Sequence, residues 1–552
     1  MKIFLFLVAL LCTLNANELD DIKLKKMIGR MLVVGFENEN INSDSQIVKD
    51  IRKYNLGGVI LFDKFYDDRN RTKNISSMKQ VQKLTKQLTE FSNKSFLIGL
   101  DQEGGKVGRL KHKYGFEKTP SAFKVSKMSP QDAKIIYKKQ SDTLKRAGIN
   151  TNFAPVVDLA INPKNKVIVG LERSFGENSI KVALYAKIMM NEQRKKNIFS
   201  VLKHFPGHGS SLGDSHQGFV DISETWSEKE LQPYKILIDE GNVDMIMTAH
   251  VFNKHLDEKY PATLSYKINT ELLREHMNYR GIIISDDLQM KAISKLYSIK
   301  EATSLAINAG VDMLLFGNQL ANVSVSQLVS VIFEEVKSGN IPIERIIESN
   351  NRIENTHTKN SLIQKPIIFS NRRKELTKKY VKDHYGKKIN NILMRPKMIV
   401  LHWTAVMDLQ KSFQRLNPEL LFSDRTDIAN ASALNVSSHF LIDRDGTIYQ
   451  LMPDNWIARH VIGLNYFSIG IENVGGEANA KEDLTNEQLQ ANVKLIKYLR
   501  AKYSSITKLI GHYEYREFEN TPLWLEKDAG YRTNKVDPGE NFMHKVRTSL
   551  HE

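Results

Sequence analysis

Cysteine is nearly absent from this sequence: its 552 residues contain one, Cys12, close to the N-terminus. A single thiol excludes an internal disulfide framework and a zinc site built from several cysteines. Long apolar runs are missing as well, since the run at residues 3–11 is too short to cross a bilayer and no later one is longer. The composition, 41% hydrophobic and 26% charged, is that of a globular chain, and the length allows two to four domains.

The first sixteen residues have the pattern of an export signal. Lys2 precedes the apolar run, and small and polar residues follow it up to Ala16. This pattern predicts a signal peptide over residues 1–16; a buried N-terminal helix is the alternative. Lipid attachment at Cys12 is not expected, because Leu11 stands where lipoprotein signals usually have a small residue. We therefore expect an exported, periplasmic protein without a transmembrane anchor.

Positive charge is in excess, with 79 Lys and Arg against 63 Asp and Glu and a formal net charge of +16. Such an excess favours anionic partners: nucleic acid, a membrane surface or an anionic wall polymer. A solvated basic surface without a partner is the alternative. Because no basic motif with interleaved aromatic residues is present, we expect no nucleic-acid partner.

Residues 17–355 alternate short apolar runs with longer amphipathic stretches. The runs lie at 31–36, 57–62, 96–101, 151–159, 200–205, 244–251, 281–287 and 311–316. Near-continuous Val, Ile and Leu are typical of parallel strands covered on both faces. Eight such units predict an α/β fold, a TIM-type (β/α)8 barrel, with a doubly wound sheet as the alternative.

Polar residues gather where these runs end, which in a barrel is the catalytic side. They are Asp101, Lys203, His204, His250, Asp286 and Asp287. The loop at 203–218 also carries Asp214 and His216, and a carboxylate beside an imidazole can make the histidine a competent acid. Asp286 is a candidate nucleophile. A metal site at His204, His208 and His216 remains a second possibility.

A second pattern begins after residues 356–392, a Lys/Arg/Asn-rich stretch that we expect to be a linker with helical pieces. Residues 393–552 predict a smaller α/β domain with a mixed central sheet. Strands are expected at 396–404, 468–475 and 508–515, a hairpin at 437–452, and a helix from Thr485 to Tyr503 with a capping box formed by Gln488.

Two histidines and a carboxylate of this domain could bind zinc. His402 and His512 end predicted strands, and Asp537 lies in the segment KVDPG. Three such ligands with an open position form a catalytic zinc site, although strand-end histidines are often structural. Glu472 could then act as a general base, and Lys535 could stabilise an oxyanion.

The first domain resembles the bacterial β-N-acetylhexosaminidases of glycoside hydrolase family 3. The resemblance is carried by DQEGGKVGRL, NFAPVVDL, ERSFG, KHFPGHG, DSH, MTAHV and SDDL, in the family's order. It implies that Asp286 is the nucleophile, that His216 with Asp214 is the acid/base, and that Asp287 is structural. It also implies sugar-binding roles for Asp101, Arg109, Arg173, Lys203 and His204, and no cofactor for the barrel.

The second domain resembles the zinc-dependent N-acetylmuramoyl-L-alanine amidases, whose fold is shared with peptidoglycan recognition proteins. The matching pieces are VLHWTA, SSHFLIDRDGTIYQL, SIGIEN, GH and K-x-DPG. The resemblance implies three zinc ligands, His402, His512 and Asp537, with Glu472 as catalytic acid/base and Lys535 as transition-state partner. It also implies a substrate-binding role for His460 and a structural or substrate-side role for His439. The segment 514–534 is longer than the family's usual turn.

Together these patterns predict a bifunctional hydrolase of peptidoglycan or its muropeptide fragments. The barrel would remove non-reducing β-linked N-acetylglucosamine with retention, and the second domain would cleave the bond between the muramyl group and L-alanine. The alternative is a hexosaminidase whose C-terminal domain only binds peptidoglycan.

Overall fold

The structure is a computed structural model that describes residues 20–93, 95–215 and 218–552. The expected signal peptide with Cys12 lies outside the described residues, and so does His216. The chain forms two compact units that divide between Thr356 and His357, each around its own hydrophobic core.

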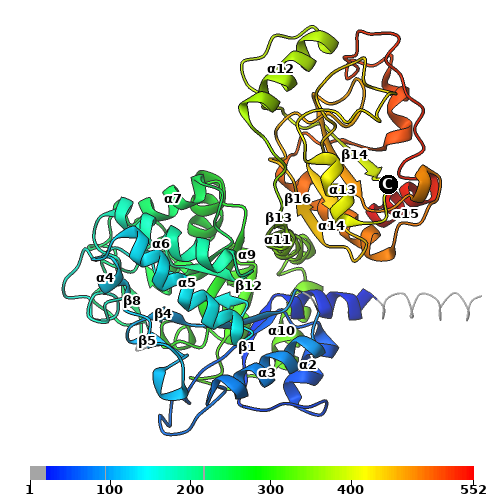
Figure 1. The fold of residues 1–552 in the computed structure, drawn as a ribbon. Coiled ribbons are helices and arrows are strands. Elements are labelled where there is room, and N and C mark those ends of the chain that lie inside the picture. Colours follow the sequence, from blue (N-terminus) through cyan, green and yellow to red (C-terminus); the bar gives the residue numbers. More distant parts are fainter. Residues whose placement is uncertain (1–19, 94, 216–217) are drawn as a thin grey trace, which may run out of the picture. The chain divides into compact units, whose positions relative to one another are not determined.

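The first unit is a closed barrel of eight parallel strands (Figure 1). They are β1 (Leu32–Gly35), β2 (Gly58–Ile60), β3 (Leu97–Leu100), β6 (Thr151–Asn152), β7 (Phe199–Phe205), β9 (Met245–Thr248), β11 (Ile282–Asp287) and β12 (Met313–Phe316). β1 pairs with both β2 and β12, which closes the ring. Seven of the eight predicted runs contain their strand entirely and the eighth overlaps it, so the barrel prediction is confirmed and a doubly wound sheet is excluded.

Helices connect successive strands and bury one face against them. The main ones are α2 (Gln46–Tyr54), α3 (Met78–Phe91), α5 (Pro130–Arg146), α6 (Ser179–Arg194), α7 (Gln232–Asp239), a π-helical segment (Lys267–His276), α9 (Ile299–Asn308), α10 (Val325–Lys337) and α11 (Ile343–Ser361). In α3, Val81, Leu84 and Leu88 are buried at helical spacing, and Ser77 caps the first turn. Two small strand pairs, β4 (Gln102–Gly104) with β5 (Val107–Gly108) and β8 (Val220–Asp221) with β10 (Val251–Phe252), lie outside the barrel ring.

The second unit contains a mixed six-stranded sheet in the order β13-β16-β15-β17-β14-β18. Its strands are β13 (Ile363–Gln364), β14 (Met398–Trp403), β15 (Phe440–Ile442), β16 (Ile448–Gln450), β17 (Ser468–Asn473) and β18 (Lys508–Gly511). Only β15 and β16 are antiparallel, as the predicted hairpin requires. α14 (Asn486–Lys502) has the predicted capping box of Thr485 and Gln488. β18 stops earlier than predicted, because residues 512–518 form a 3-10 helix.

The stretch 357–392 is part of the second unit and not a separate linker. Its helix α12 (Asn371–Tyr385) places Tyr380, Val381 and Tyr385 in the core. The buried Arg373 donates to the carbonyl oxygens of Leu416, Asn417 and Pro418, at the end of α13 (Leu409–Leu416). The many exposed Lys and Arg of α12 conceal this apolar face in the sequence. A final helix, α15 (Glu540–Leu550), completes the unit.

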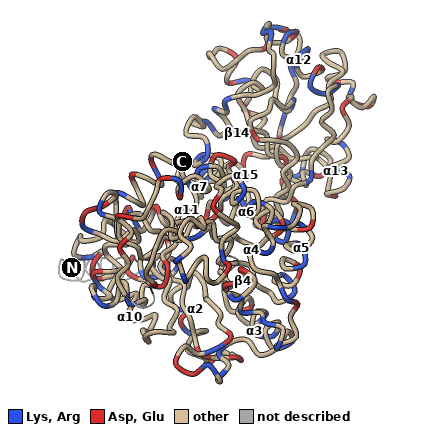
Figure 2. Tube along the Cα trace, turned by 90° about the vertical axis from the view of Figure 1, so that its left-hand side faces the viewer, with Lys and Arg blue, Asp and Glu red and all other residues tan. Residues whose placement is uncertain are grey.

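Lys and Arg are distributed over both units, with several on α12 (Figure 2). Among the residues that the structure describes, no helix has the length and apolar character needed to cross a membrane.

Candidate active sites

A cavity of about 750 Å³ opens where the barrel strands end. Its lining includes the described residues that the sequence predicted to act there: Asp101, Arg109, Arg173, Lys203, His204, Asp214 and Asp286. They come from four barrel strands or the loops that follow them, and the barrel brings them to one rim, as parallel strands around a closed ring require.

Asp101, directly after β3, forms two ion pairs, one with Arg109 and one with Lys203. One carboxylate oxygen lies 2.7 Å from Arg109 Nη2 and the other 2.8 Å from Lys203 Nζ. Burial alone would raise the pKa of Asp101, but the charges of Lys203 and Arg109 outweigh it and hold the pKa well below its usual range. Asp101 is therefore a carboxylate at neutral pH and can accept hydrogen bonds from hydroxyl groups.

Glu103 is a site residue that the sequence did not single out. It accepts from Arg173 through both carboxylate oxygens, at 2.8 and 2.7 Å, and lies 2.9 Å from Lys203 Nζ. Glu103 is buried, so the paired cations offset the cost of its charge. It fixes the orientation of two predicted sugar-binding side chains, Arg173 and Lys203. Its place in the segment DQEGG, two residues after Asp101, was the available signal.

Asp158 is a second residue that sequence reasoning missed. Its Oδ2 lies 2.7 Å from His204 Nδ1, and its Oδ1 accepts from the backbone N–H groups of His204 and His208 at 3.1 and 2.9 Å. His204 Nε2 is 3.4 Å from Arg173 Nη2 on the cavity side. The carboxylate thus sets which nitrogen of His204 carries the proton.

Asp286 and Asp287 are the last two residues of β11, and their hydrogen bonds distinguish them. The Asp287 N–H donates to Asp286 Oδ1 at 2.8 Å, while Asp287 Oδ1 accepts from the Gln289 N–H. The Asp287 carbonyl oxygen lies 2.9 Å from His250 Nε2. Asp287 and His250 therefore support the strand end from which Asp286 projects.

The loop that carries Asp214 is anchored at its start. Asn165 Nδ2 donates to the carbonyl oxygens of His208 and Gly209 at 2.8 and 3.1 Å. The Gly209 N–H donates to Glu230 Oε2 at 2.7 Å. Burial raises the pKa of Glu230 to about 7. The acid/base partner predicted for Asp214, His216, lies outside the described residues.

The second unit has a cavity of about 590 Å³ at the ends of three neighbouring parallel strands. In the register of β14 and β17, His402 pairs with Glu472, and Leu401 of β14 pairs with Gly511 of β18. His512 follows Gly511 directly, so it reaches the level of His402. Adjacent strands in parallel register place these side chains next to one another.

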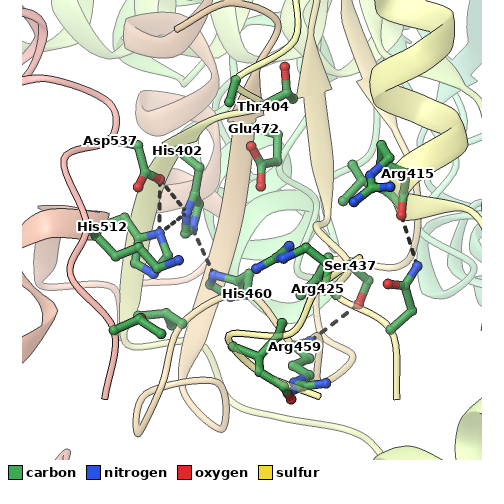
Figure 3. A pocket seen from close by; sticks show the side chains of 18 of the residues that line it. His402, Thr404, Arg415, Arg425, Ser437, Arg459, His460, Glu472, His512 and Asp537 are labelled. Atoms are coloured by element: carbon green, nitrogen blue, oxygen red, sulfur yellow. Dashed lines mark hydrogen bonds and ion pairs between the residues drawn. The ribbon is translucent and has the colours of Figure 1, made fainter. Parts of the chain in front are cut away.

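Asp537 completes a compact group with the two histidines (Figure 3). His402 Nδ1 lies 3.0 Å from His512 Nδ1, and Asp537 Oδ2 lies 3.2 Å from the first nitrogen and 2.9 Å from the second. Burial lowers the pKa of His512 to about 4, so its ring is neutral. Two imidazoles and a carboxylate this close fit a divalent cation. Among residues 20–93, 95–215 and 218–552, this is the only group of that kind.

The long segment 514–534 does not displace Asp537. The Tyr513 N–H donates to the Asp537 carbonyl oxygen at 3.1 Å, which ties the returning chain to the end of β18. Within the segment, Trp524 stacks on Tyr515 and the Leu525 N–H donates to the Gly463 carbonyl oxygen. The segment therefore folds as an added wall, and Tyr531 and Thr533 from it line the cavity.

Glu472 and Lys535 line the cavity beside this group. Glu472 Oε2 is buried without a hydrogen-bond partner among the described residues. Burial raises the pKa of Glu472 to about 7. A carboxyl group with such a pKa can both take up and release a proton near neutral pH.

His460 and His439 are two further buried histidines of this unit. His439 accepts from the Gly470 N–H through Nδ1 and is 2.7 Å from the Trp456 carbonyl oxygen through Nε2, so both ring nitrogens support the sheet. His460 lies against His402 with Nδ1 at 3.0 Å from His402 Nε2. It is only 8% exposed.

Two arginines that the sequence did not single out, Arg415 and Arg425, also line the cavity. Each forms a two-point ion pair with an aspartate, Arg415 with Asp424 and Arg425 with Asp427. They belong to α13 and the irregular segment after it, where no pattern marks a site.

Comparison with known proteins agrees with this division. Residues 23–356 match the model of the glycosyl hydrolase family 3 N-terminal domain, and residues 393–540 match that of N-acetylmuramoyl-L-alanine amidase. The chain is 31% identical over 336 residues to beta-hexosaminidase A of Pseudoalteromonas piscicida, which covers 56% of this chain and 54% of that protein. It is 34% identical over 284 residues to a beta-hexosaminidase of Tolumonas auensis, covering 50% of this chain and 80% of that one.

The fold is shared with a solved structure, the beta-N-acetylhexosaminidase of Beutenbergia cavernae. The TM-score is 0.55 at 23% identity, over 60% of this chain and 98% of that chain. The family match covers more than half of the sequence, including every strand of the barrel. The chain therefore belongs to glycosyl hydrolase family 3, with an N-acetylmuramoyl-L-alanine amidase domain fused after the barrel.

Proposed function

We propose that the chain is a bifunctional peptidoglycan hydrolase with one active site in each unit. The barrel removes a non-reducing β-linked N-acetylglucosamine, and the second unit cleaves the amide between the muramyl lactyl group and L-alanine. The observation that carries the proposal is a polar cavity in each unit, one lined by Asp286 and the other by His402, His512 and Asp537. The two bonds flank the same muramyl sugar, so the activities are chemically related.

In the barrel, the Asp286 carboxylate attacks the anomeric carbon while the glycosidic bond breaks and His216 gives a proton to the leaving oxygen. Water then releases the sugar from Asp286, and His216 takes the proton from that water. Asp214, two residues before His216 in the sequence, supplies a negative charge that favours the charged form of an imidazole. Asp101, Lys203, Arg173 and His204 hold the sugar through groups whose charges and tautomers are fixed by Glu103 and Asp158.

In the second unit, His402, His512 and Asp537 would hold zinc. A bound zinc ion supplies Lewis acidity, which makes coordinated water a nucleophile near neutral pH and polarises the amide carbonyl. Glu472, whose Oε2 has no hydrogen-bond partner among the described residues, accepts a proton from the attacking water and passes it to the leaving amine of L-alanine. Lys535 supplies positive charge where the carbonyl oxygen becomes negative.

The test is mass spectrometry of a defined disaccharide-peptide after digestion. The wild-type chain should release both sugar and peptide, Asp286→Asn only the peptide, and Glu472→Gln only the sugar. Each variant is the folded control for the other site. If Glu472→Gln still releases peptide, the second mechanism is wrong.

The alternative function for the C-terminal unit is to bind peptidoglycan without cleaving it. The arrangement of Glu472 beside the His402–His512–Asp537 group favours catalysis, because a binding surface has no need of a buried carboxyl group with a raised pKa. Release of sugar but no peptide by the wild-type chain would select the binding role.

We also propose that the protein acts outside the cytoplasm, in the periplasm. The proposal rests on the signal-peptide pattern of residues 1–16 and on a substrate that lies there. Fractionation should find a shortened chain in the periplasm, and a full-length chain in the cytoplasm would contradict export.

A further inference from the structure

His460 lies behind the ligand group and contacts it through one atom pair. Its Nδ1 is 3.0 Å from His402 Nε2, and the two rings are nearly perpendicular, at 87°. His402 Nδ1, on the other side of the same ring, faces His512 and Asp537. His460 thus meets the nitrogen of His402 that points away from His512 and Asp537.

The protons on His460 can be assigned from its other neighbour, Ser468. His460 Nε2 lies 3.3 Å from the Ser468 carbonyl oxygen, which can only accept. It also lies 3.1 Å from Ser468 Oγ, whose own proton is donated to the Leu464 carbonyl oxygen at 2.9 Å. Both partners are acceptors, so His460 Nε2 carries the proton. A neutral imidazole carries one proton, so with that proton on Nε2 the other nitrogen, Nδ1, is an acceptor.

The assignment passes on to His402. Because His460 Nδ1 accepts, His402 Nε2 is the donor, and in the neutral ring that metal binding requires this is the only proton. His402 Nδ1 is then a free lone pair, directed at His512 Nδ1 and Asp537 Oδ2. This is the tautomer that a metal ligand needs.

The position of His460 is fixed by its surroundings. Asn465 Oδ1 accepts from the backbone N–H groups of His460 and Val461 at 2.8 and 2.9 Å. A Cβ at position 470 would lie 2.8 Å from the His460 ring. Glycine at this position of β17 therefore leaves room for the ring. The contact with His402 therefore belongs to a defined arrangement of the sheet.

We propose that His460 is a positioning residue that fixes the tautomer and ring orientation of His402 for zinc, and that it does not bind substrate. The inference rests on the proposed amidase function. The sequence predicted a substrate-binding role for His460. We propose instead that His460 connects Ser468 to His402 through hydrogen bonds.

The test measures zinc affinity of the full chain by competition with a chromophoric chelator. His460→Ala should weaken zinc binding by about 10- to 100-fold, the usual effect of losing such a partner. His460→Asn should restore most of it, because the asparagine Oδ1 can accept from His402 Nε2. His439→Asn is the matched control: its ring lies 5.9 Å from that of His460 but contacts no ligand, so zinc affinity should stay within about 2-fold.

Kinetics at saturating zinc separate the two roles. For His460→Ala, KM for a muramyl peptide should equal that of the wild type. Unchanged zinc affinity with a raised KM overturns the proposal, and so does a His460→Asn variant as weak as His460→Ala. A wild-type chain that binds no zinc would instead contradict the amidase function itself.

Discussion

Asp158 and His204 are 46 residues apart in the sequence, yet Asp158 Oδ2 lies 2.7 Å from His204 Nδ1 inside the barrel. The same carboxylate also accepts two backbone N–H groups of the loop that follows β7. One buried side chain therefore orients the ring that we propose to bind the sugar and the start of the loop that carries the proposed acid/base.

Replacing Asp158 with asparagine should reverse the tautomer of His204. The amide group would donate to Nδ1, and Nε2 would then carry a proton that faces Arg173. We expect kcat/KM for a chromogenic N-acetylglucosaminide to fall by at least about 100-fold, by analogy with loss of an orienting carboxylate elsewhere. Amidase activity should not change. Asp142→Asn, at a partly exposed ion pair with Lys196, is the control and should retain full activity.

Metal removal should separate the two activities. Dialysis against a chelator should abolish peptide release and leave sugar release intact, because the mechanism proposed for the barrel uses a carboxylate nucleophile and an imidazole acid/base. Added zinc should restore the first activity. It should also raise the melting temperature of the second unit, since zinc binds only its folded form. Equal loss of both activities would contradict the assignment.

Arg425 should recognise a carboxylate of the substrate peptide. Its Nε and Nη2 bond to Asp427, and no described residue bonds to Nη1, whereas Arg415 uses both terminal nitrogens on Asp424. Arg425→Ala should lower kcat/KM about 10- to 100-fold for a peptide with a free carboxylate, the value of a charged hydrogen bond. The same substitution should have little effect on kcat/KM for a peptide whose carboxylate has been converted to an amide. Equal losses on both, or the same selectivity from Arg415→Ala, would refute this role.

Glu230 should make the barrel less stable as pH rises. Its pKa is raised from 4.5 to about 7 by burial, so between these values the folded state binds more protons than the unfolded one. The free energy of unfolding should therefore fall with rising pH, by up to about 3 kcal/mol. Glu230→Gln cannot ionise and should lack this slope in thermal melts from pH 4.5 to 8. Parallel profiles for both proteins would contradict the prediction.

Residues 357–392 should be required for the second unit to fold. A fragment of residues 357–552 should be folded and melt cooperatively. A fragment of residues 393–552 lacks Tyr380, Val381 and Tyr385, and each lost core side chain costs roughly 2–5 kcal/mol. We expect the shorter fragment to be unfolded or insoluble. Equal melting temperatures would show that α12 is dispensable.

The sequence predicted what depends on local pattern. Apolar runs located the barrel strands, and strand-end polarity located Asp101, Lys203 and Asp286. It could not predict Glu103 and Asp158 as site residues, because their roles depend on partners brought close only by the closed ring. Arg373 and Tyr380 were hidden for another reason, since a helix rich in exposed Lys and Arg gives little sign of its buried face.

His460 illustrates the same limit within a recognised motif. Its place in the sequence pointed to the cavity, but which of its nitrogens carries a proton depends on Ser468 and Leu464, which the motif does not include. Family resemblance located the residue, and its hydrogen bonds are the basis of the positioning role that we propose.

The register of β14 and β17 has a consequence for how the second site comes into being. His402 and Glu472 are paired residues of neighbouring strands, so correct strand pairing alone puts them side by side. A slip of one residue would turn one of the two to the opposite face. A misregistered chain would then lose the packing of its core and would also turn either His402 or Glu472 away from the cavity. A molecule of this unit that has folded stably has therefore already brought these two residues of the proposed site together.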